Sequence, residues 1–270
     1  MSLTVRELEE LLFEAYPKHD AEPWDKVGLS VGNPLEEVKK VAVSLDVTVN
    51  ALRKAKELGA NVLLAHHPIF IDSPFPVIDQ AGGGINPSSS LFEAAKLGIS
   101  VISMHTNLDR SQEAIELAAN LLDAQFIEGF EDRFGVKDGR ELGRLGSVNR
   151  LHEPMSLKSF ARLASSKFSR VQSVWGEPDS EVKNFVWVSG SASSLVKDVV
   201  NRGNIDCLLC GECSYHNALD ASLSDLKIVI LGHDVSELPF KKLLADRLIH
   251  LGLEANCIVD IDQSKNWFNI

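Results

Sequence analysis

The chain lacks the features of several large protein classes. No apolar stretch approaches the roughly 20 residues of a membrane-spanning helix, and the start MSLTVRELEE lacks the basic and apolar regions of a signal peptide. Basic side chains are outnumbered, because 27 Lys and Arg stand against 38 Asp and Glu and give a formal net charge of -11. This composition opposes a clustered basic surface for a phosphate backbone. We therefore expect a cytoplasmic protein that binds neither membranes nor nucleic acid.

Several motifs of nucleotide binding and nucleophilic catalysis are also missing. The phosphate-binding pattern GxxxxGK[ST] does not occur, and no GxGxxG follows a predicted strand. No G-x-S-x-G elbow is present, and no cysteine has an obvious activating histidine. Water is therefore the nucleophile that we expect if the protein is catalytic.

Cysteine is scarce, with four residues in 270, but three of them are closely spaced. Cys207, Cys210 and Cys213 form a CxxCxxC pattern, which occurs in cluster and zinc sites, and Cys257 is the remaining candidate ligand. The segment IDCLLCGECSYH is instead typical of an apolar strand entering a turn, where free cysteine packs as a small apolar side chain. We favour packing over metal binding.

The apolar pattern predicts alternating helices and strands. Thr4 and Glu7 form a capping box before an amphipathic helix that Pro17 ends. The strand VAVSLD, a helix over 48–59 and the strand NVLLA then form a βαβ unit. A second series of such elements follows a stretch rich in Gly, Asp and Arg at 128–143. We predict an α/β fold with two α/β domains of similar build, each a mixed sheet flanked by helices.

The predicted first domain is discontinuous. It comprises residues 1–127 and 227–270, and the second domain comprises residues 128–226. The strand KIVIL and the chain after it are assigned to the first domain because His233 has to meet His66 if both belong to one site.

Imidazole and carboxylate side chains follow several of the predicted buried strands: His66, His67, Asp109, His233 and Glu237. An open α/β sheet brings such residues together beyond its strand ends. Three imidazoles and two carboxylates exceed the roughly three protein ligands of one catalytic ion. Shared between two ions, with one bridging carboxylate, they leave room for water and substrate. We predict a dinuclear metal site in the cleft between the domains.

For any one of these side chains, a helix cap or a loop hydrogen bond is an adequate alternative. Adjacent histidines before Pro68 are harder to explain in that way. Side chains alternate along a strand, so both rings can face one site only if the chain turns there.

Seven segments occur in an order characteristic of one family: WDKVGL, VAVSLDVT, LLAHHPIF, HTNLD, GRLGSV, GECSYH and GHDVSE. The chain resembles the Nif-three-like family, also known as GTP cyclohydrolase I type 2 homologues, from Trp24 to Glu237. The resemblance implies the metal ligands His66, His67, Asp109, His233 and Glu237. It implies that Glu237 bridges the ions. His66 and Asp109 would then complete the coordination of one ion, and His67 and His233 that of the other. It also implies a homo-oligomer, a hexameric ring with sites facing an inner cavity.

The metal ions are expected to be divalent, but their identity stays open. Mixed imidazole and carboxylate ligation suits zinc, iron and manganese alike.

Further polar residues beside the predicted ligands have a functional interpretation, and Asp46 has a structural one as well. Asp46 either orients a histidine of the site or caps the helix that begins at Thr48. His105 is interpreted as a donor to the site or a proton carrier. Glu212 and His216 are further candidates for proton transfer.

Three loop segments are similarly ambiguous. Trp24 and Asp25 have a role beside the site by resemblance, or form a packed corner. AGGGINPSSS is interpreted as a lid over the substrate. SGSASS at 189–194 either holds an anion or caps a helix.

The sequence thus predicts a metal-dependent hydrolase acting on a nucleotide-like small molecule, with GTP ring hydrolysis implied by the resemblance. The alternative is a noncatalytic regulator or carrier that binds metal and a small ligand. The surplus of acid and base groups beside the ligands favours the enzyme.

Overall fold

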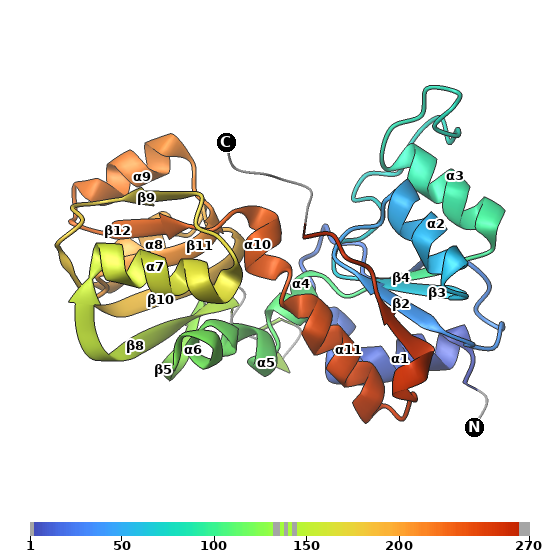
Figure 1. The fold of residues 1–270 in the computed structure, drawn as a ribbon, viewed down its shortest axis with the longest axis horizontal. Helices are drawn as coiled ribbons and strands as arrows, with labels where there is room; N and C mark the ends of the chain where they lie inside the picture. Colours follow the sequence, from blue (N-terminus) through green and yellow to red (C-terminus); the bar gives the residue numbers. More distant parts are fainter. Residues whose placement is uncertain (1–2, 132–135, 138–139, 142–144, 265–270) are drawn as a thin grey trace. The chain divides into compact units, whose positions relative to one another are not determined.

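The computed structural model describes residues 3–131, 136–137, 140–141 and 145–264. The chain divides into two compact units, Met1–Leu108 with Phe240–Ile270 and Asp109–Pro239 (Figure 1). Each unit has its own mixed sheet with helices on both faces, which confirms the predicted α/β class. None of the helices in the described residues has both the length and the apolar character that a membrane crossing requires.

The first unit is built around a sheet in the order β1-β4-β3-β2-β13. Strands β2, β3, β4 and β13 are parallel, and β1 is antiparallel to β4. In chain order the elements are α1 (Val5–Ala15), η1 (Lys18–Asp20), β1 (Gly28–Val31), β2 (Val41–Ser44), α2 (Val49–Glu57), β3 (Val62–Ala65), α3 (Ser88–Leu97), β4 (Ser100–Ser103), α4 (Thr106–Asp109), whose last residue begins the second unit, α11 (Phe240–His250), η2 (Ala255–Cys257) and β13 (Ile258–Asp260).

Helices cover both faces of this sheet, with α2 and α3 on one face and α1 and α11 on the other (Figure 1). Every residue of β2, β3 and β4 is therefore buried, as expected of parallel strands. Because these neighbours are parallel, their carboxyl ends share one edge of the sheet. The segments after 44, 65 and 103 leave from that edge and carry Asp46, the adjacent histidines and His105.

Helix starts in this unit follow local side-chain chemistry. Thr4 Oγ1 accepts from the backbone N–H of Glu7, and the Glu7 carboxylate accepts from the backbone N–H of Thr4, which confirms the predicted capping box. Thr48 caps α2 by accepting from the N–H of Ala51.

The second unit holds a six-stranded sheet in the order β5-β8-β10-β11-β12-β9 and a two-stranded pair, β6-β7. Strands β10, β11 and β12 are parallel, and the other pairs are antiparallel. In chain order the elements are α5 (Gln112–Ile115), α6 (Leu117–Leu122), β5 (Ala124–Glu131), β6 (Val136–Lys137), β7 (Arg140–Glu141), β8 (Leu145–Ser156), α7 (Leu157–Phe168), β9 (Ser173–Trp175), β10 (Glu181–Ser191), α8 (Val196–Arg202), β11 (Cys207–Glu212), α9 (Tyr215–Ser222), β12 (Lys227–Ile230) and α10 (His233–Glu237).

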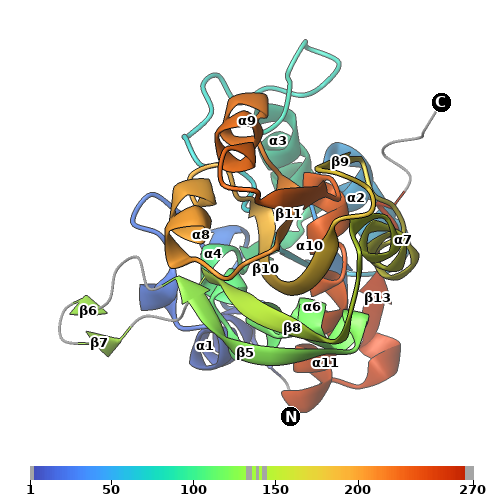
Figure 2. The same cartoon turned by 90° about the vertical axis from the view of Figure 1, so that its left-hand side faces the viewer.

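Figure 2 shows α8 and α9 on one side of β10 and β11 in this unit, and α7 on the other. Helix α7 is held by aromatic packing, since the Phe160 and Phe185 ring centroids lie 5.1 Å apart and those of Phe168 and Trp187 lie 5.2 Å apart. Burial of these rings supplies much of the driving force for folding the unit.

The unit boundaries differ from those expected at 127/128 and 226/227. The KIVIL strand, β12, pairs with β11 and β9 of the second sheet, so its assignment to the first domain is wrong. Strand β5 already pairs with β8, so the chain enters the second unit at Asp109, before the 128–143 stretch. Parts of that stretch and of GRLGSV lie outside the described residues. The segment FIEGFE has the charge and glycine content of a loop, yet it forms an edge strand with a shift in register.

The cysteines of β11 pack in the core, as expected. Cys207 and Cys210 are fully buried, and three positions apart on a strand they face opposite sides of the sheet. They therefore cannot share one metal ion. Burial raises the pKa of both thiols well above the ordinary value.

This burial predicts which thiols react. In the native protein we expect a disulfide reagent to label Cys257 and, more slowly, half-buried Cys213, whose pKa burial also raises. Cys207 and Cys210 should react only after unfolding. Thiol counting with and without denaturant tests this, and fast native labelling of Cys210 would contradict the packing.

Candidate metal centre

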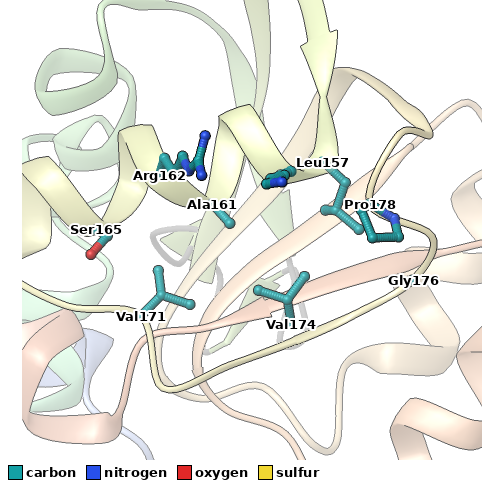
Figure 3. A pocket seen from close by; sticks show the side chains of 9 residues that line it. Leu157, Ala161, Arg162, Ser165, Val171, Val174, Gly176 and Pro178 are labelled. Atoms are coloured by element: carbon teal, nitrogen blue, oxygen red, sulfur yellow. The ribbon is translucent and has the colours of Figure 1, made fainter. Parts of the chain in front are cut away.

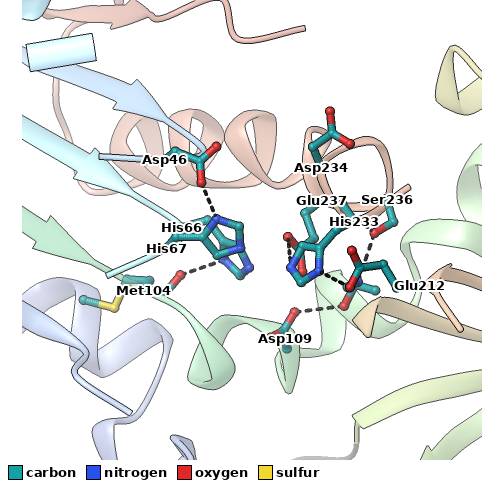
Figure 4. A network of polar contacts seen from close by, with 12 residues as sticks. Asp46, His66, His67, Met104, Asp109, Glu212, His233, Asp234, Ser236 and Glu237 are labelled. Atoms are coloured by element: carbon teal, nitrogen blue, oxygen red, sulfur yellow. Dashed lines mark hydrogen bonds and ion pairs between the residues drawn. The ribbon is translucent and has the colours of Figure 1, made fainter. Parts of the chain in front are cut away.

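His66 follows β3 directly, and its ring is fixed by the neighbouring strand. Its backbone N–H donates to Ser44 O at 3.2 Å and continues the β2–β3 pairing. Its Nδ1 lies 2.9 Å from the carbonyl oxygen of Met104 (Figure 4). Because a carbonyl oxygen only accepts, Nδ1 carries the proton and Nε2 carries the lone pair that a metal ion can use. The buried ring packs edge-on against Phe240, with the centroids 5.0 Å apart.

His67 is oriented by a carboxylate. Its Nδ1 lies 2.8 Å from Asp46 Oδ1 (Figure 4). The ionised carboxylate accepts a hydrogen bond from Nδ1–H, which again leaves the lone pair on Nε2. Because Thr48 caps α2, the helix-capping alternative for Asp46 is wrong. The interpretation of Asp46 as a residue that orients a histidine is confirmed.

His105 is held by the WDKVGL loop. Its Nδ1 lies 2.9 Å from Oδ1 of Asp25, whose other oxygen accepts from the backbone N–H of Thr106 at 3.0 Å and from its hydroxyl at 2.5 Å. Burial alone would raise the pKa of Asp25, but the hydrogen bond and charge of His105 and the hydrogen bonds from Thr106 outweigh it and lower the pKa to about 2. Trp24 packs edge-on against His105, with the ring centroids 6.0 Å apart. The loop therefore acts on the histidine cluster and is more than a packed corner.

These three imidazoles form one cluster in the first unit. Their candidate ligand atoms lie within 4.8 Å of one another, and the His66 and His67 ring centroids are 4.9 Å apart. Each Nδ1 is engaged by an oxygen acceptor, so each ring has the tautomer that a metal ligand requires. The donor set thus fits a divalent transition ion. The sequence identified His105 only as a donor or proton carrier, whereas its position also qualifies it as a ligand.

A second cluster forms in the second unit around α10. His233 Nδ1 lies 3.1 Å from Glu212 Oε2, and His233 Nε2 lies 3.2 Å from Glu237 Oε2, one helical turn on (Figure 4). Glu212 accepts a hydrogen bond from Nδ1–H and so leaves Nε2 with the lone pair of a ligand. Carboxylate oxygens of Asp109 and Glu237 also lie within 4.8 Å of each other.

Close backbone approach positions this second cluster. A Cβ on Gly190 would lie 2.4 Å from Glu237 Oε1, and its φ of +55° favours glycine. The Gly190 N–H donates to Ser236 Oγ at 2.9 Å, and that hydroxyl donates to the His233 carbonyl oxygen at 2.7 Å. Ser189 Oγ donates to Asp109 Oδ1 at 2.9 Å. Sequence patterns gave no signal for the role of Ser189, because a serine at a strand end is common.

The remaining predicted residues are placed less clearly. His216 is exposed on α9 and packs against Tyr215, and in the described part of the second unit no hydrogen bond joins it to His233 or Glu212. Its role in proton transfer stays a prediction. The serines of SGSASS do not cap α8, whose N-cap residue is Leu195 and makes no side-chain hydrogen bond.

Two cavities differ in their relation to these clusters. In the second unit, a cavity of about 460 Å³ lies between α7 and β9 (Figure 3). Its lining, including Leu157, Val171 and Val174, contains no His, Asp or Glu. In the first unit, a cavity of about 550 Å³ is lined by His67 and Asp46 themselves. The chemistry of the described residues therefore favours the 550 Å³ cavity of the first unit as a ligand site, although the 460 Å³ cavity of the second unit is more apolar.

Comparison with known proteins supports the family relationship. A sequence model of the family described as Duf34/NIF3 (NGG1p interacting factor 3) matches residues 3–266. A Clostridium acetobutylicum protein named GTP cyclohydrolase 1 type 2 homolog is 28% identical over 256 residues, covering 92% of this chain and 90% of that protein. A Helicobacter pylori protein named GTP cyclohydrolase 1 type 2 is 25% identical over 264 residues, covering 97% of each.

A solved structure agrees in fold. The Bacillus cereus protein related to NIF3 superposes with a TM-score of 0.85 at 20% identity, covering 100% of this chain and 99% of that one. At this identity the likeness concerns the fold alone. The family match over residues 3–266 establishes that the chain belongs to the Duf34/NIF3 family.

Proposed function

We propose that the clusters of the two units hold two divalent metal ions jointly, and that the protein is a metal-dependent hydrolase of a nucleotide-like small molecule. The observation that carries the proposal is the histidine cluster of the first unit. Three rings, each with Nδ1 engaged by an oxygen acceptor, offer candidate ligand nitrogens that lie within 4.8 Å of one another. Purely structural packing does not require this arrangement.

The proposed ligands are His66, His67, Asp109, His233 and Glu237. Glu237 is the proposed bridge, with His66 and Asp109 on one ion and His67 and His233 on the other. When bound, such ions lower the pKa of coordinated water toward neutrality and polarise the bond under attack.

Neighbouring side chains support this chemistry. Asp46 and Glu212 each accept a hydrogen bond from Nδ1 of a ligand histidine and hold its ring in place. His105, held by Asp25, is the proposed proton carrier of the first unit. Glu212 is half-exposed and is a second candidate for proton exchange with solvent.

The names of the relatives guide the choice of substrate. A protein that is 25% identical carries the name GTP cyclohydrolase 1 type 2. We extend the proposal to hydrolysis of a ring in a nucleotide-like heterocycle, with GTP as the first compound to test.

Two measurements test this function. Elemental analysis of protein purified without added metal should give close to two transition ions per chain. Incubation with GTP, GMP and guanosine should release formate or phosphate, and a chelator should abolish the release. Metal binding without turnover across such compounds would instead support a noncatalytic metal- and ligand-binding protein, and absence of bound metal would contradict both.

Removal of the carboxylate at Asp46 should weaken metal binding. In Asp46→Ala, His67 loses its Nδ1 acceptor and its fixed tautomer, so we expect about 10–100-fold lower metal affinity with little loss of stability. Titration against a competing chelator measures the affinity. Asp72→Ala removes an exposed carboxylate nearby and should leave metal affinity unchanged.

The homo-oligomer implied by the resemblance is also a proposal. We expect light scattering coupled to size-exclusion chromatography to give six times the 29.6 kDa chain mass. A monomer at micromolar concentration would contradict it.

A further inference from the structure

The cavity beside His67 lies where α/β proteins bind ligands. It is lined by residues 46–48 after β2, residues 67–72 after β3, and residues 86–87 before α3. The first two segments leave the carboxyl ends of parallel neighbours. Its volume of about 550 Å³ suits a small molecule. A smaller cavity of about 350 Å³ shares Thr48 and Asn86 with it and extends along the start of α2.

The cavity lining is partly apolar and includes the phenyl ring of Phe70 as well as the imidazole of His67. Phe70 lines the cavity and packs against the core behind it, so its ring is supported. Ile69, Ile71 and the flanking prolines add further apolar surface. A supported aromatic ring among aliphatic walls suits a flat ligand ring, which stacks on it.

The polar groups of the cavity are acidic or neutral. Its lining in the described part of the first unit includes Asp46 and Asp72 but no lysine or arginine. Among the residues around the adjoining cavity there is again none. A phosphate group placed here would meet carboxylates, and no lysine or arginine side chain of the lining would compensate its charge. N–H donors on a ligand would instead find acceptors in Asp72 and Asp46.

We infer that this cavity binds a planar nitrogen heterocycle through its ring and N–H edge, uncharged at the bound end, and that any phosphate group of the ligand lies outside it. The inference rests on the proposed function, because it assigns the ring of the substrate to the His67 side of the site. It explains how a chain without a phosphate-binding loop can recognise a nucleotide-like compound by its base.

The test compares a base without phosphate with a phosphate without base. Guanosine binding to the full-length protein is measured by calorimetry, with ribose 5-phosphate as competitor. We expect guanosine to bind and ribose 5-phosphate not to displace it. Phe70→Leu should weaken guanosine binding by about tenfold, since stacking is lost while an apolar side chain remains.

Matched variants control for folding. Phe75→Leu makes the same change at a 97% exposed position of the same loop and should bind guanosine as the parent does. Asp72→Lys changes an exposed side chain, so the fold should tolerate it, and it should weaken guanosine binding severalfold while allowing ribose 5-phosphate to bind.

The inference would be overturned if guanosine did not bind at millimolar concentration or if ribose 5-phosphate displaced it. It would also be overturned if Phe70→Leu and Phe75→Leu lost guanosine affinity equally. Metal analysis of the same samples separates the two proposals. Guanosine binding to protein that holds no metal would contradict the proposed function and would still support the assignment of the cavity.

Discussion

Replacing His66 with alanine in the first unit, or Glu237 with glutamine in the second, is expected to lower metal affinity by more than about 100-fold and to abolish turnover. His66→Ala removes an imidazole whose tautomer the Met104 carbonyl fixes. Glu237→Gln removes the charge of the carboxylate that faces His233 Nε2 at 3.2 Å and that we propose as the bridge. Since each change lies in a different unit, the pair tests whether both clusters serve the same ions.

Elemental analysis and chelator titration of the two variants measure this effect. His250→Ala on α11 and His152→Ala on β8 change exposed histidines, one in each unit, and should retain parental metal content. If Glu237→Gln kept the full metal content while His66→Ala lost it, the histidine cluster would bind metal alone. The joint site would then be wrong.

Much of the first unit could be predicted because its sequence signals agree with one another. Apolar runs of the length of a buried strand alternate with capped amphipathic helices, and parallel pairing then fixes which residues share an edge. For this reason the placement of His66, His67 and Asp46 at one sheet edge followed from the sequence.

The partners that fix the rings could not be predicted as completely. His66 is anchored by a backbone carbonyl, and backbone atoms carry no sequence signal. Asp25 and His105 are 80 positions apart, so only the folded loop brings them into contact. Their pairing depends on the course of that loop, which periodicity does not determine.

The unit boundaries were mispredicted for a related reason. The argument that His233 must meet His66 assigned β12 to the first unit, although strand pairing places it between β11 and β9. Function constrains which side chains have to act together and says little about which sheet carries them. The edge strand β5 was missed because one solvated face and a glycine give it the composition of a loop.

Asp25→Asn is expected to destabilise the protein by about 1–3 kcal/mol at neutral pH. The carboxylate accepts four hydrogen bonds, from His105 Nδ1 and the Lys26 backbone N–H on one oxygen and from the Thr106 N–H and hydroxyl on the other. An asparagine has one carbonyl oxygen, so its amide N–H₂ must face either His105 or Thr106. Chemical denaturation of both proteins measures the difference, and Asp72→Asn, a change of an exposed carboxylate, should show none.

The lowered pKa of the Asp25 carboxylate predicts how the stability difference between Asp25→Asn and the parent depends on pH. Its pKa is about 2 in the folded protein against 3.8 ordinarily, so its contribution is complete above about pH 4 and is lost as pH falls through 2. The stability of Asp25→Asn should therefore approach that of the parent between about pH 4 and pH 2. A constant difference over this range would show that the carboxylate is not held as described.

Metal affinity of Asp25→Asn separates a positioning role from simple stability. If the amide N–H₂ faces His105 Nδ1, the imidazole proton has to move to Nε2, and the lone pair then points away from the cluster. A folded variant should then bind metal about 10–100-fold more weakly or lose turnover at unchanged metal content. Either outcome assigns His105 a function at the ions, whereas unchanged affinity and turnover in a folded variant would restrict Asp25 to holding the loop against Thr106.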